Sequence, residues 1–353
     1  MSLSLTSHTL RDKVLHFASK PQTTVSLKHM VVHGQTPSWK TNLAGFLSDE
    51  LPIRFARKLK ALEELPNDLG HSDSIQMVKT WYAQSFEELT SFHRPGSAAA
   101  AAVLAQKEEF AETLHAIKTR HRPTVSTLAQ GLQEWKSTAK RPRDDPHVLP
   151  SSARQWLDRF HSSRIGIRFL IDQYLATHAP PNGILGTVHK NCNVHSVVSS
   201  AIEHARTVSE QRHGAGPAPP VDLVCPEDLA FPYVPRHLNF ITSEIVKNSL
   251  NAVMRNQPHG LPYAPSGSDS EAPVRVAVIK GKEDIVIKVS DRGGGLARSA
   301  MPTVWSYSGH GLPLSRLYAR YFGGDLCLFS MEGYGTDVYI HLNRLADVRE
   351  ALN

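Results

Sequence analysis

One predicted helix carries polar residues that could perform acid–base and metal chemistry. If residues 237–255 are placed at about 100° each, as in an α-helix, one polar stripe spans roughly 100°. The stripe contains Glu244, Lys247, Asn248, Asn251 and Arg255. Glu244 can accept a proton, and one turn away the Asn248 carboxamide oxygen can bind a hard cation. An ordinary amphipathic surface helix explains the same stripe.

A run of three glycines follows a predicted strand. The segment Ser-Asp-Arg-Gly-Gly-Gly-Leu occupies residues 290–296. Consecutive glycines cost backbone entropy and pack no side chain, so they indicate that the chain passes close to a ligand. Asp291, at the end of the strand, can accept a hydrogen bond from an exocyclic amine such as that of adenine. A tight turn is the alternative, although a turn seldom needs three glycines.

Two further glycine segments lie nearer the C-terminus. Gly309-His310-Gly311-Leu312-Pro313 precedes a predicted helix over residues 314–321. Glycine and proline at a helix start expose backbone N–H groups at its positive end, which favours phosphate binding. They are also common helix punctuation, and the segment is neither a Walker A loop nor a GxGxxG motif. The last segment, residues 333–336, ends in Gly335-Thr336 and fits a hairpin turn equally well.

The second half of the chain must position these residues. Alternating apolar residues predict one hairpin over residues 274–279 and 284–290, and another over 325–330 and 336–342. Helical segments lie between them. We therefore predict a domain over residues 184–345 in which helices cover one face of a sheet, an α+β sandwich.

The first half of the chain has the period of helices. Apolar spacing predicts four helices, over residues 51–65, 74–92, 98–135 and 151–175. They indicate an antiparallel four-helix bundle within a domain of residues 1–178, ended by the proline-rich linker 179–183. A helical scaffold without any activity explains this half adequately.

Composition excludes several classes of protein. The 353 residues are 41% hydrophobic, which excludes a disordered chain and suits two domains, and no apolar run is long enough for a membrane span. The net charge of +6 is spread along the chain, so we predict no nucleic-acid partner. Cys192, Cys225 and Cys327 are far apart, which argues against zinc and disulfides and for a reducing compartment. The first twenty residues hold three basic residues and one acid, a faint sign of a mitochondrial transit peptide.

Together the motifs resemble a known nucleotide site. Glu-x-x-Lys-Asn on a helix, Asp-x-Gly-x-Gly after a strand, Gly-x-Gly-Leu before a helix and Gly-Thr in a hairpin follow the order of the GHKL superfamily of gyrase, Hsp90, histidine kinases and MutL. Its ATP-binding domain is the Bergerat α/β sandwich. Other segments are similar to the mitochondrial pyruvate dehydrogenase kinases, whose sister family is the branched-chain 2-oxo acid dehydrogenase kinases. These segments are residues 311–322, 324–326 and 330–337, and in the helical half 50–54, 81–86, 120–121, 129–131, 157–160 and 163–168.

The resemblance implies a role for each motif residue. Glu244 would take the proton of the substrate serine, Lys247 would neutralise phosphate charge, and Asn248 would hold Mg²⁺ on ATP. Asp291 and Thr336 would contact adenine. The full cofactor-binding set would be Asn248, Asp291, Gly293, Gly295, Leu296, Gly309, Gly311, Leu312 and Thr336. Phosphoryl transfer needs mainly positioning and charge stabilisation, so this set suffices. K⁺ is an optional further ion.

The helical half would also bind partners of this family. A pocket for small 2-oxo acid-like regulators would consist of Tyr82, Ser85, Lys118, His121, Arg164 and Arg168. An arginine pair suits a carboxylate, whereas surface arginines that pair with nearby acids are the alternative. The far end of the bundle would bind the lipoyl domain of the E2 component.

Several features depart from the family pattern. Phe240 replaces a histidine one turn before Glu244, and Asn251 replaces an arginine three residues after Asn248. Only residues 296–308 separate the two glycine motifs, a short lid, and no Gly-Phe precedes Gly309. The long C-terminal tail by which pyruvate dehydrogenase kinases cross between subunits is also absent. Most of the motif wording favours a pyruvate dehydrogenase kinase, whereas Phe240 favours the branched-chain family.

The resulting hypothesis is an ATP- and Mg²⁺-dependent protein serine kinase of the mitochondrial matrix. It would phosphorylate and inactivate the E1 component of a 2-oxo acid dehydrogenase complex, and it would be a homodimer through its nucleotide-binding domains. Two alternatives remain. One is a simple ATPase in which Glu244 activates water, and the other is a catalytically weakened scaffold subunit that binds ATP.

Overall fold

The computed structural model describes residues 8–33, 39–65, 69–93, 105–138, 149–178, 187–213, 217–256, 273–307 and 309–350. The chain divides into two compact units. The first takes most residues up to Thr187, and the second takes Ser26–Val31 and the residues from Val188 onward. The predicted linker 179–183 and the alanine-rich start of the predicted third helix, residues 98–104, lie outside the described residues.

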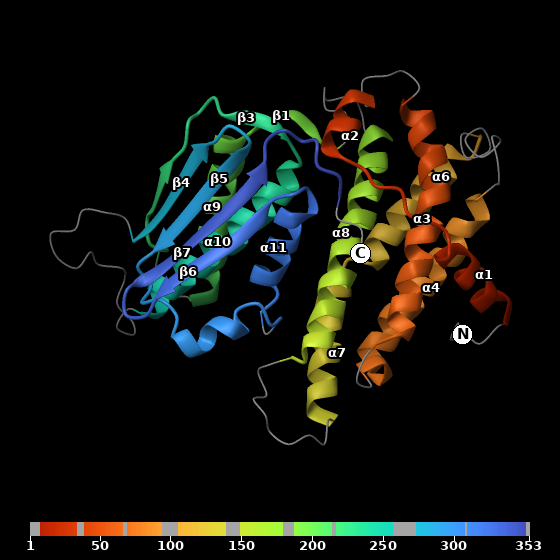
Figure 1. The fold of residues 1–353 in the computed structure, drawn as a ribbon, viewed down its shortest axis with the longest axis horizontal. Coiled ribbons are helices and arrows are strands. Elements are labelled where there is room, and N and C mark those ends of the chain that lie inside the picture. Colours follow the sequence, from red (N-terminus) through yellow and green to blue (C-terminus); the bar gives the residue numbers. More distant parts are fainter. Residues whose placement is uncertain are drawn as a thin grey trace. The chain divides into compact units, whose positions relative to one another are not determined.

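The first unit is helical (Figure 1). Its helices are α1 (His8–Ala18), α3 (Trp39–Glu63), α4 (Asp73–Phe92), α6 (Lys107–Arg120), α7 (Thr124–Thr138) and α8 (Ser151–His178), with a 3₁₀ turn η1 (Leu69–His71). Helix α4 shows how sequence sets an element. The Ser72 hydroxyl caps its start by accepting from the Ile75 N–H, and Val78, Tyr82 and Phe86 then recur at helical spacing on its buried face.

The predicted third helix over residues 98–135 is wrong, because two helices occupy its described part. Helix α6 ends at Arg120, and α7 begins at Thr124. Pro123 lies between them. It lacks an N–H and disfavours helical backbone at the preceding residue. The His121 N–H closes α6 on the carbonyls of Ile117 and Thr119.

Residues 8–18 form helix α1, which buries Leu10, Val14 and Phe17. Phe17 makes edge-to-face ring contacts with Phe86 and His93 of the same unit. This stretch is therefore an amphipathic helix whose apolar side packs in the first unit.

The second unit contains a five-stranded sheet in the order β2-β4-β5-β7-β6. Its strands are β2 (Val221–Val224), β4 (Val274–Lys280), β5 (Asp284–Asp291), β6 (Asp325–Met331) and β7 (Gly335–Asn343). Strands β2 and β4 are parallel, and the other neighbours are antiparallel. The two predicted hairpins, β4–β5 and β6–β7, are thereby confirmed. Strands β1 (His189–Asn193) and β3 (Ala230–Tyr233) form a separate antiparallel pair.

Helices α9 (Val194–His213), α10 (Pro235–Arg255) and α11 (Gly311–Tyr321) lie on one face of the five-stranded sheet (Figure 1). Alternate strand residues such as Val276, Ile287 and Ile340 are buried on that side. The predicted α+β class, with an N-terminal helical part and a sandwich of the GHKL type, is confirmed. The short helix α2 (Leu27–His33) begins within Ser26–Val31, the N-terminal segment that belongs to this unit. In the part of the chain that the structure describes, no helix is long and apolar enough to span a membrane.

Candidate functional site

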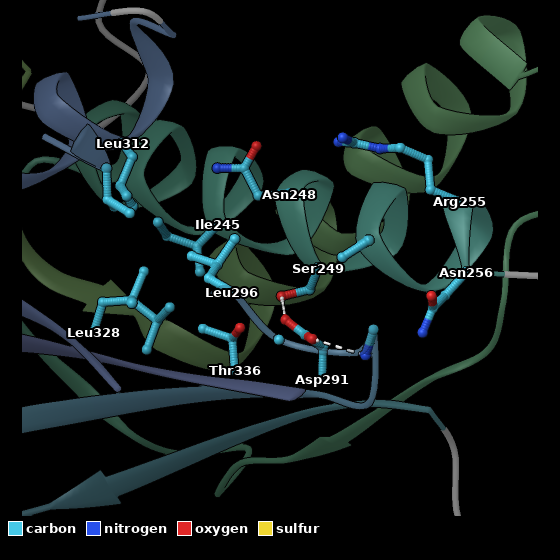
Figure 2. A pocket seen from close by; sticks show the side chains of 15 residues that line it. Ile245, Asn248, Ser249, Arg255, Asn256, Asp291, Leu296, Leu312, Leu328 and Thr336 are labelled. Atoms are coloured by element: carbon cyan, nitrogen blue, oxygen red, sulfur yellow. Dashed lines mark hydrogen bonds between the residues drawn. The ribbon is translucent and has the colours of Figure 1, made fainter. Parts of the chain in front are cut away.

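A cavity of about 340 Å³ opens between α10 and the ends of β5, β6 and β7 (Figure 2). The residues that line it are Ile245, Asn248, Ser249, Ala252, Arg255, Asn256, Asp291, Gly293, Gly295, Leu296, Val304, Leu312, Leu328, Thr336 and Val338. The predicted residues among them are Asn248, Asp291, Gly293, Gly295, Leu296, Leu312 and Thr336. The structure thus brings four separate motifs to one cavity.

Asp291 forms a fixed acceptor in the wall of this cavity. It is the last residue of β5, and its side chain is buried. The Ser249 hydroxyl donates to Oδ2 at 2.9 Å, and the Gly293 N–H donates to Oδ1 at 3.0 Å (Figure 2). Burial raises the pKa of Asp291, while these two bonds and one from the Thr336 N–H act in the opposite direction. Each carboxylate oxygen retains acceptor capacity for a ligand amine.

The glycines after Asp291 allow segments of backbone to meet. A Cβ at Gly293 would overlap Ala252 and the backbone of α10, and one at Gly295 would overlap the carbonyl of Met331. Gly295 also has φ of +66°, which side chains rarely adopt. Both residues line the cavity. The glycines therefore let this loop pack closely against α10 and β6 and also pass beside the cavity.

A hydroxyl pair supports the wall next to Asp291. The Leu296 N–H donates to Ser330 Oγ at 2.8 Å, and Ser330 Oγ lies 3.0 Å from Thr336 Oγ1. This network fixes the loop after the glycines to the β6–β7 hairpin. Sequence reasoning assigned no role to Ser330 or to Ser249. Their signal was a small hydroxyl residue on an otherwise buried face.

Glu244 and Lys247 lie on α10 outside the cavity lining, and they form an ion pair with each other. Glu244 also abuts the first residue of α11, because a Cβ at Gly311 would overlap Glu244 Oε2. The N–H groups in the first turn of a helix have no partner within that helix and carry partial positive charge. The structure therefore gathers a carboxylate, an ammonium group and a helix N-terminus beside the cavity. Gly309 precedes this turn and meets no atom within 4 Å of an added Cβ.

The turn of α10 before Glu244 packs against α11. The Phe240 ring lies 4.8 Å from that of Tyr318, and the His237 ring lies 4.8 Å from the same tyrosine. Burial lowers the pKa of His237 to about 3, so this imidazole is neutral at physiological pH. The lid segment contains a 3₁₀ helix, η2 (Arg298–Thr303). Asn251 is buried and faces away from solvent.

The first unit has its own small cavity of about 10 Å³. It is lined by Phe55, Tyr82, Ile117, Lys118, His121, Arg164, Ile167, Arg168 and Ile171, which include five of the six predicted regulator-pocket residues. The sixth, Ser85, lies behind His121, with 2.9 Å between its Oγ and His121 Nε2.

Charge and burial shape this pocket. Burial, aided by the charge of Arg164, lowers the pKa of His121 to about 3, and burial raises the pKa of Tyr82 to about 12. Arg164 is itself buried and donates to the His121 carbonyl at 3.1 Å, so it is not an ordinary surface arginine. Lys118 pairs with Asp172 at 2.5 Å.

Sequence reasoning missed Arg120, which lies beside this pocket and contacts Ser85. Its guanidinium donates to Ser85 Oγ at 2.7 Å and pairs with Glu88 through two hydrogen bonds. The signal available was only its position beside His121 in a segment similar to the kinase family.

The second unit has the features of a GHKL nucleotide-binding domain. It contains a sheet, a helix that carries Glu244 and Asn248, and a cavity whose wall includes Asp291. A family model described as "Histidine kinase-, DNA gyrase B-, and HSP90-like ATPase" matches residues 233–346. A second one, "Mitochondrial branched-chain alpha-ketoacid dehydrogenase kinase", matches residues 24–197.

Relatives match nearly the whole chain. A mitochondrial pyruvate dehydrogenase (acetyl-transferring) kinase of Arabidopsis thaliana is 36% identical, over 97% of this chain and 96% of its own length. The one of Schizosaccharomyces pombe is 34% identical over 99% and 100%, and human isozyme 4 is 33% identical over 95% and 84%. The chain belongs to the family of mitochondrial pyruvate and branched-chain 2-oxo acid dehydrogenase kinases.

Proposed function

We propose that this protein is a protein serine kinase of the mitochondrial matrix that uses ATP and Mg²⁺ to phosphorylate, and so inactivate, the E1 component of the pyruvate dehydrogenase complex. The relatives named above are mitochondrial pyruvate dehydrogenase kinases, which supports the substrate and the compartment. The observation that carries the proposal is the arrangement of Asp291 and Asn248 in one cavity with Glu244 beside it.

The cavity would select an adenine nucleotide through Asp291. Its carboxylate is oriented by Ser249 and the Gly293 N–H, so its free acceptor sites are fixed in direction. Leu296, Leu328 and other apolar side chains of the lining would contact the faces of a planar base. Such a site hydrogen-bonds the amine of adenine and rejects a base that presents a carbonyl there.

The Asn248 carboxamide lines the cavity and supplies the type of oxygen ligand that Mg²⁺ prefers (Figure 2). Among the described residues, no cluster of three or more His, Cys, Asp or Glu side chains could hold a metal. The single Asn248 carboxamide suits an ion such as Mg²⁺, which takes most of its ligands from phosphate and water. When bound, Mg²⁺ would neutralise charge on the phosphates. The N–H groups of Gly311 and Leu312 at the start of α11 would receive phosphate oxygens.

Glu244 is the candidate general base. It lies against the first turn of α11, where the terminal phosphate would sit, and can accept the proton of a serine hydroxyl. Its carboxylate forms an ion pair with Lys247. Lys247 would exchange this partner for the phosphates when a nucleotide binds, which leaves Glu244 free to act.

The test uses ATP labelled on the γ-phosphate and purified E1 of the pyruvate and of the branched-chain complex. We expect labelled serine on pyruvate dehydrogenase E1, and we expect Glu244→Gln to abolish the transfer while nucleotide binding persists. Glu203→Gln, on an exposed residue of α9, is the matched control. Labelling only of branched-chain E1 would assign the sister activity, and free phosphate without protein label would assign a simple ATPase.

A weakened scaffold subunit is the second candidate, and the contact of Phe240 with Tyr318 favours it. Phe240 offers Glu244 no titratable neighbour one turn away, and Asn251 adds no positive charge. A scaffold would bind nucleotide in the same assay yet label neither E1, and Glu244→Gln would change nothing measurable.

We also propose regulation and assembly by each unit. The pocket around Arg164 and Arg168 would bind the carboxylate of a small 2-oxo acid-like regulator.

The helical unit would bind the lipoyl domain of E2. The second unit would form a homodimer through the face of its sheet opposite α9–α11, where Phe329 and Met331 of β6 are 64% and 67% exposed.

A further inference from the structure

Arg255 is a cavity residue to which neither the motifs nor the family resemblance gives a role. It lies in the last turn of α10 and lines the cavity with Asn248 and Asp291. The side chain is exposed, so its charge is available to a ligand. Among the lining residues, Arg255 is the only one with a positive charge and Asp291 is the only one with a negative charge.

The contacts of Arg255 fix its direction. Its Nε donates to the carbonyl of Asn251 at 3.2 Å, one turn earlier on the same helix. The side chain therefore runs back along α10 toward Asn248, and Figure 2 shows the guanidinium on that side of the cavity, away from Asp291. This bond uses the Nε donor, and the terminal Nη groups make no other hydrogen bond with the described residues.

The charge of Arg255 is uncompensated among the described residues, where no ion pair includes it. Lys247, the other cation of the polar stripe, is paired with Glu244. Asp291 takes its hydrogen bonds from Ser249 and backbone N–H groups instead of from Arg255. An open cavity with one unpaired guanidinium on its rim attracts an anion.

We propose that Arg255 binds the phosphate chain of the nucleotide. A ligand with its base on Asp291 would pass Asn248 on the way to the start of α11, and the Arg255 guanidinium, which points toward Asn248, would meet the phosphate nearest the ribose. A guanidinium suits phosphate because its planar donors match two oxygens at once. Arg255 would thus supply, one turn further along α10, the positive charge that Asn251 does not. The inference rests on the proposed ATP site.

Calorimetric titration with adenosine, AMP, ADP and ATP, each with Mg²⁺, tests this role. We expect Arg255→Ala to weaken ATP binding about tenfold, the usual size of a lost charge-assisted hydrogen bond, and to leave adenosine binding unchanged. Arg255→Lys should fall between the two, because it keeps the charge and loses the fork. The first nucleotide of the series that shows the loss identifies the phosphate contacted.

Arg212→Ala is the matched control, since Arg212 is also an exposed arginine in the last turn of a helix, α9, and does not line the cavity. If Arg255→Ala binds ATP as tightly as Arg212→Ala does, Arg255 is merely a solvated surface residue and the inference is wrong. If the unaltered protein binds none of the four ligands, the proposed ATP site fails instead. The two failures are therefore distinguishable.

Discussion

At the scale of single residues, the protonation state of Asp291 should control recognition of the base. Burial raises its pKa, and its hydrogen bonds from Ser249 and the Gly293 N–H partly offset that rise. The ionised carboxylate is the better acceptor for an amine. Acidification toward the raised pKa must therefore weaken base recognition before it would at an exposed aspartate.

We predict that adenosine affinity falls as pH is lowered from 7.5 to 5. Adenosine is the probe because it carries no phosphate that titrates in this range. Asp291→Asn should lose about tenfold in affinity at pH 7.5, where a charged acceptor is removed, and should no longer lose affinity on acidification. Asp222→Asn, in a residue of β2 paired with Arg275, is the control and should keep the original profile. A flat profile in the unaltered protein would contradict the prediction.

Site residues could be predicted from the sequence where their type is unusual for its local context. Site residues of a type that is common in such a context were missed. Asp291 and Asn248 stood out because three glycines and an amide beside a carboxylate need an explanation. Ser249 and Ser330 did not, because a serine on a buried face looks like any small residue, and only the fold shows its partners. The structure gives the positions of the predicted site residues, and their chemical roles remain predictions.

At the scale of elements, local chemistry decided what could be predicted. The β4–β5 and β6–β7 hairpins followed from alternation over six or seven residues on each side of a glycine-containing turn. Strands β2 and β3 have four residues each, too short for a period to emerge, and the parallel pairing of β2 with β4 depends on tertiary contacts. The break at Pro123 was visible in the sequence but was outweighed by the helical pattern on both sides.

The start of α11 supplies a prediction about the position of Glu244. An added Cβ at Gly311 would overlap Glu244 Oε2, the movable end of a side chain, so Gly311→Ala should turn the carboxylate aside without moving either helix. We expect this substitution to lower phosphoryl transfer at least about tenfold and to change stability by less than about 1 kcal/mol. The γ-phosphate assay and chemical denaturation measure the two effects. Full transfer in Gly311→Ala would show that Glu244 does not occupy this position.

At the scale of the whole molecule, each unit contains a buried histidine whose pKa is strongly lowered. The pKa of His121 in the first unit and of His237 in the second is lowered to about 3. In the unfolded chain each would titrate near 6.5. Between these values the unfolded state binds the extra proton, so the stabilising contribution is complete above about pH 6.5 and is lost as pH falls toward 3.

We predict that the unfolding free energy of each unit falls between pH 6.5 and 4 by up to about 1.4 kcal/mol per pH unit for its histidine. His121→Gln and His237→Phe should each reduce the slope of the unit that contains them. His204→Gln, in an exposed residue of α9, should not. Thermal unfolding followed at several pH values measures the slopes. Unchanged slopes in both variants would mean that other groups control acid unfolding.

The proposed homodimer makes a prediction about the open face of the sheet. Phe329 alternates along β6 with Leu328, which lines the nucleotide cavity, so the two side chains point to opposite faces. The Phe329 ring contacts Tyr339 of β7 at 5.8 Å and is 64% exposed. A charge placed there would have to be desolvated in a dimer and stays hydrated in a monomer.

Phe329→Lys should therefore shift the protein from dimer to monomer in sedimentation equilibrium, with a dissociation constant at least about tenfold higher. Met77→Lys is the control, since Met77 is an exposed apolar residue of α4 in the other unit and should leave the assembly unchanged. Adenosine binding should persist in Phe329→Lys, because the cavity lies on the covered face. A monomer in the unaltered protein, or a dimer that Phe329→Lys does not weaken, would contradict assembly through this face.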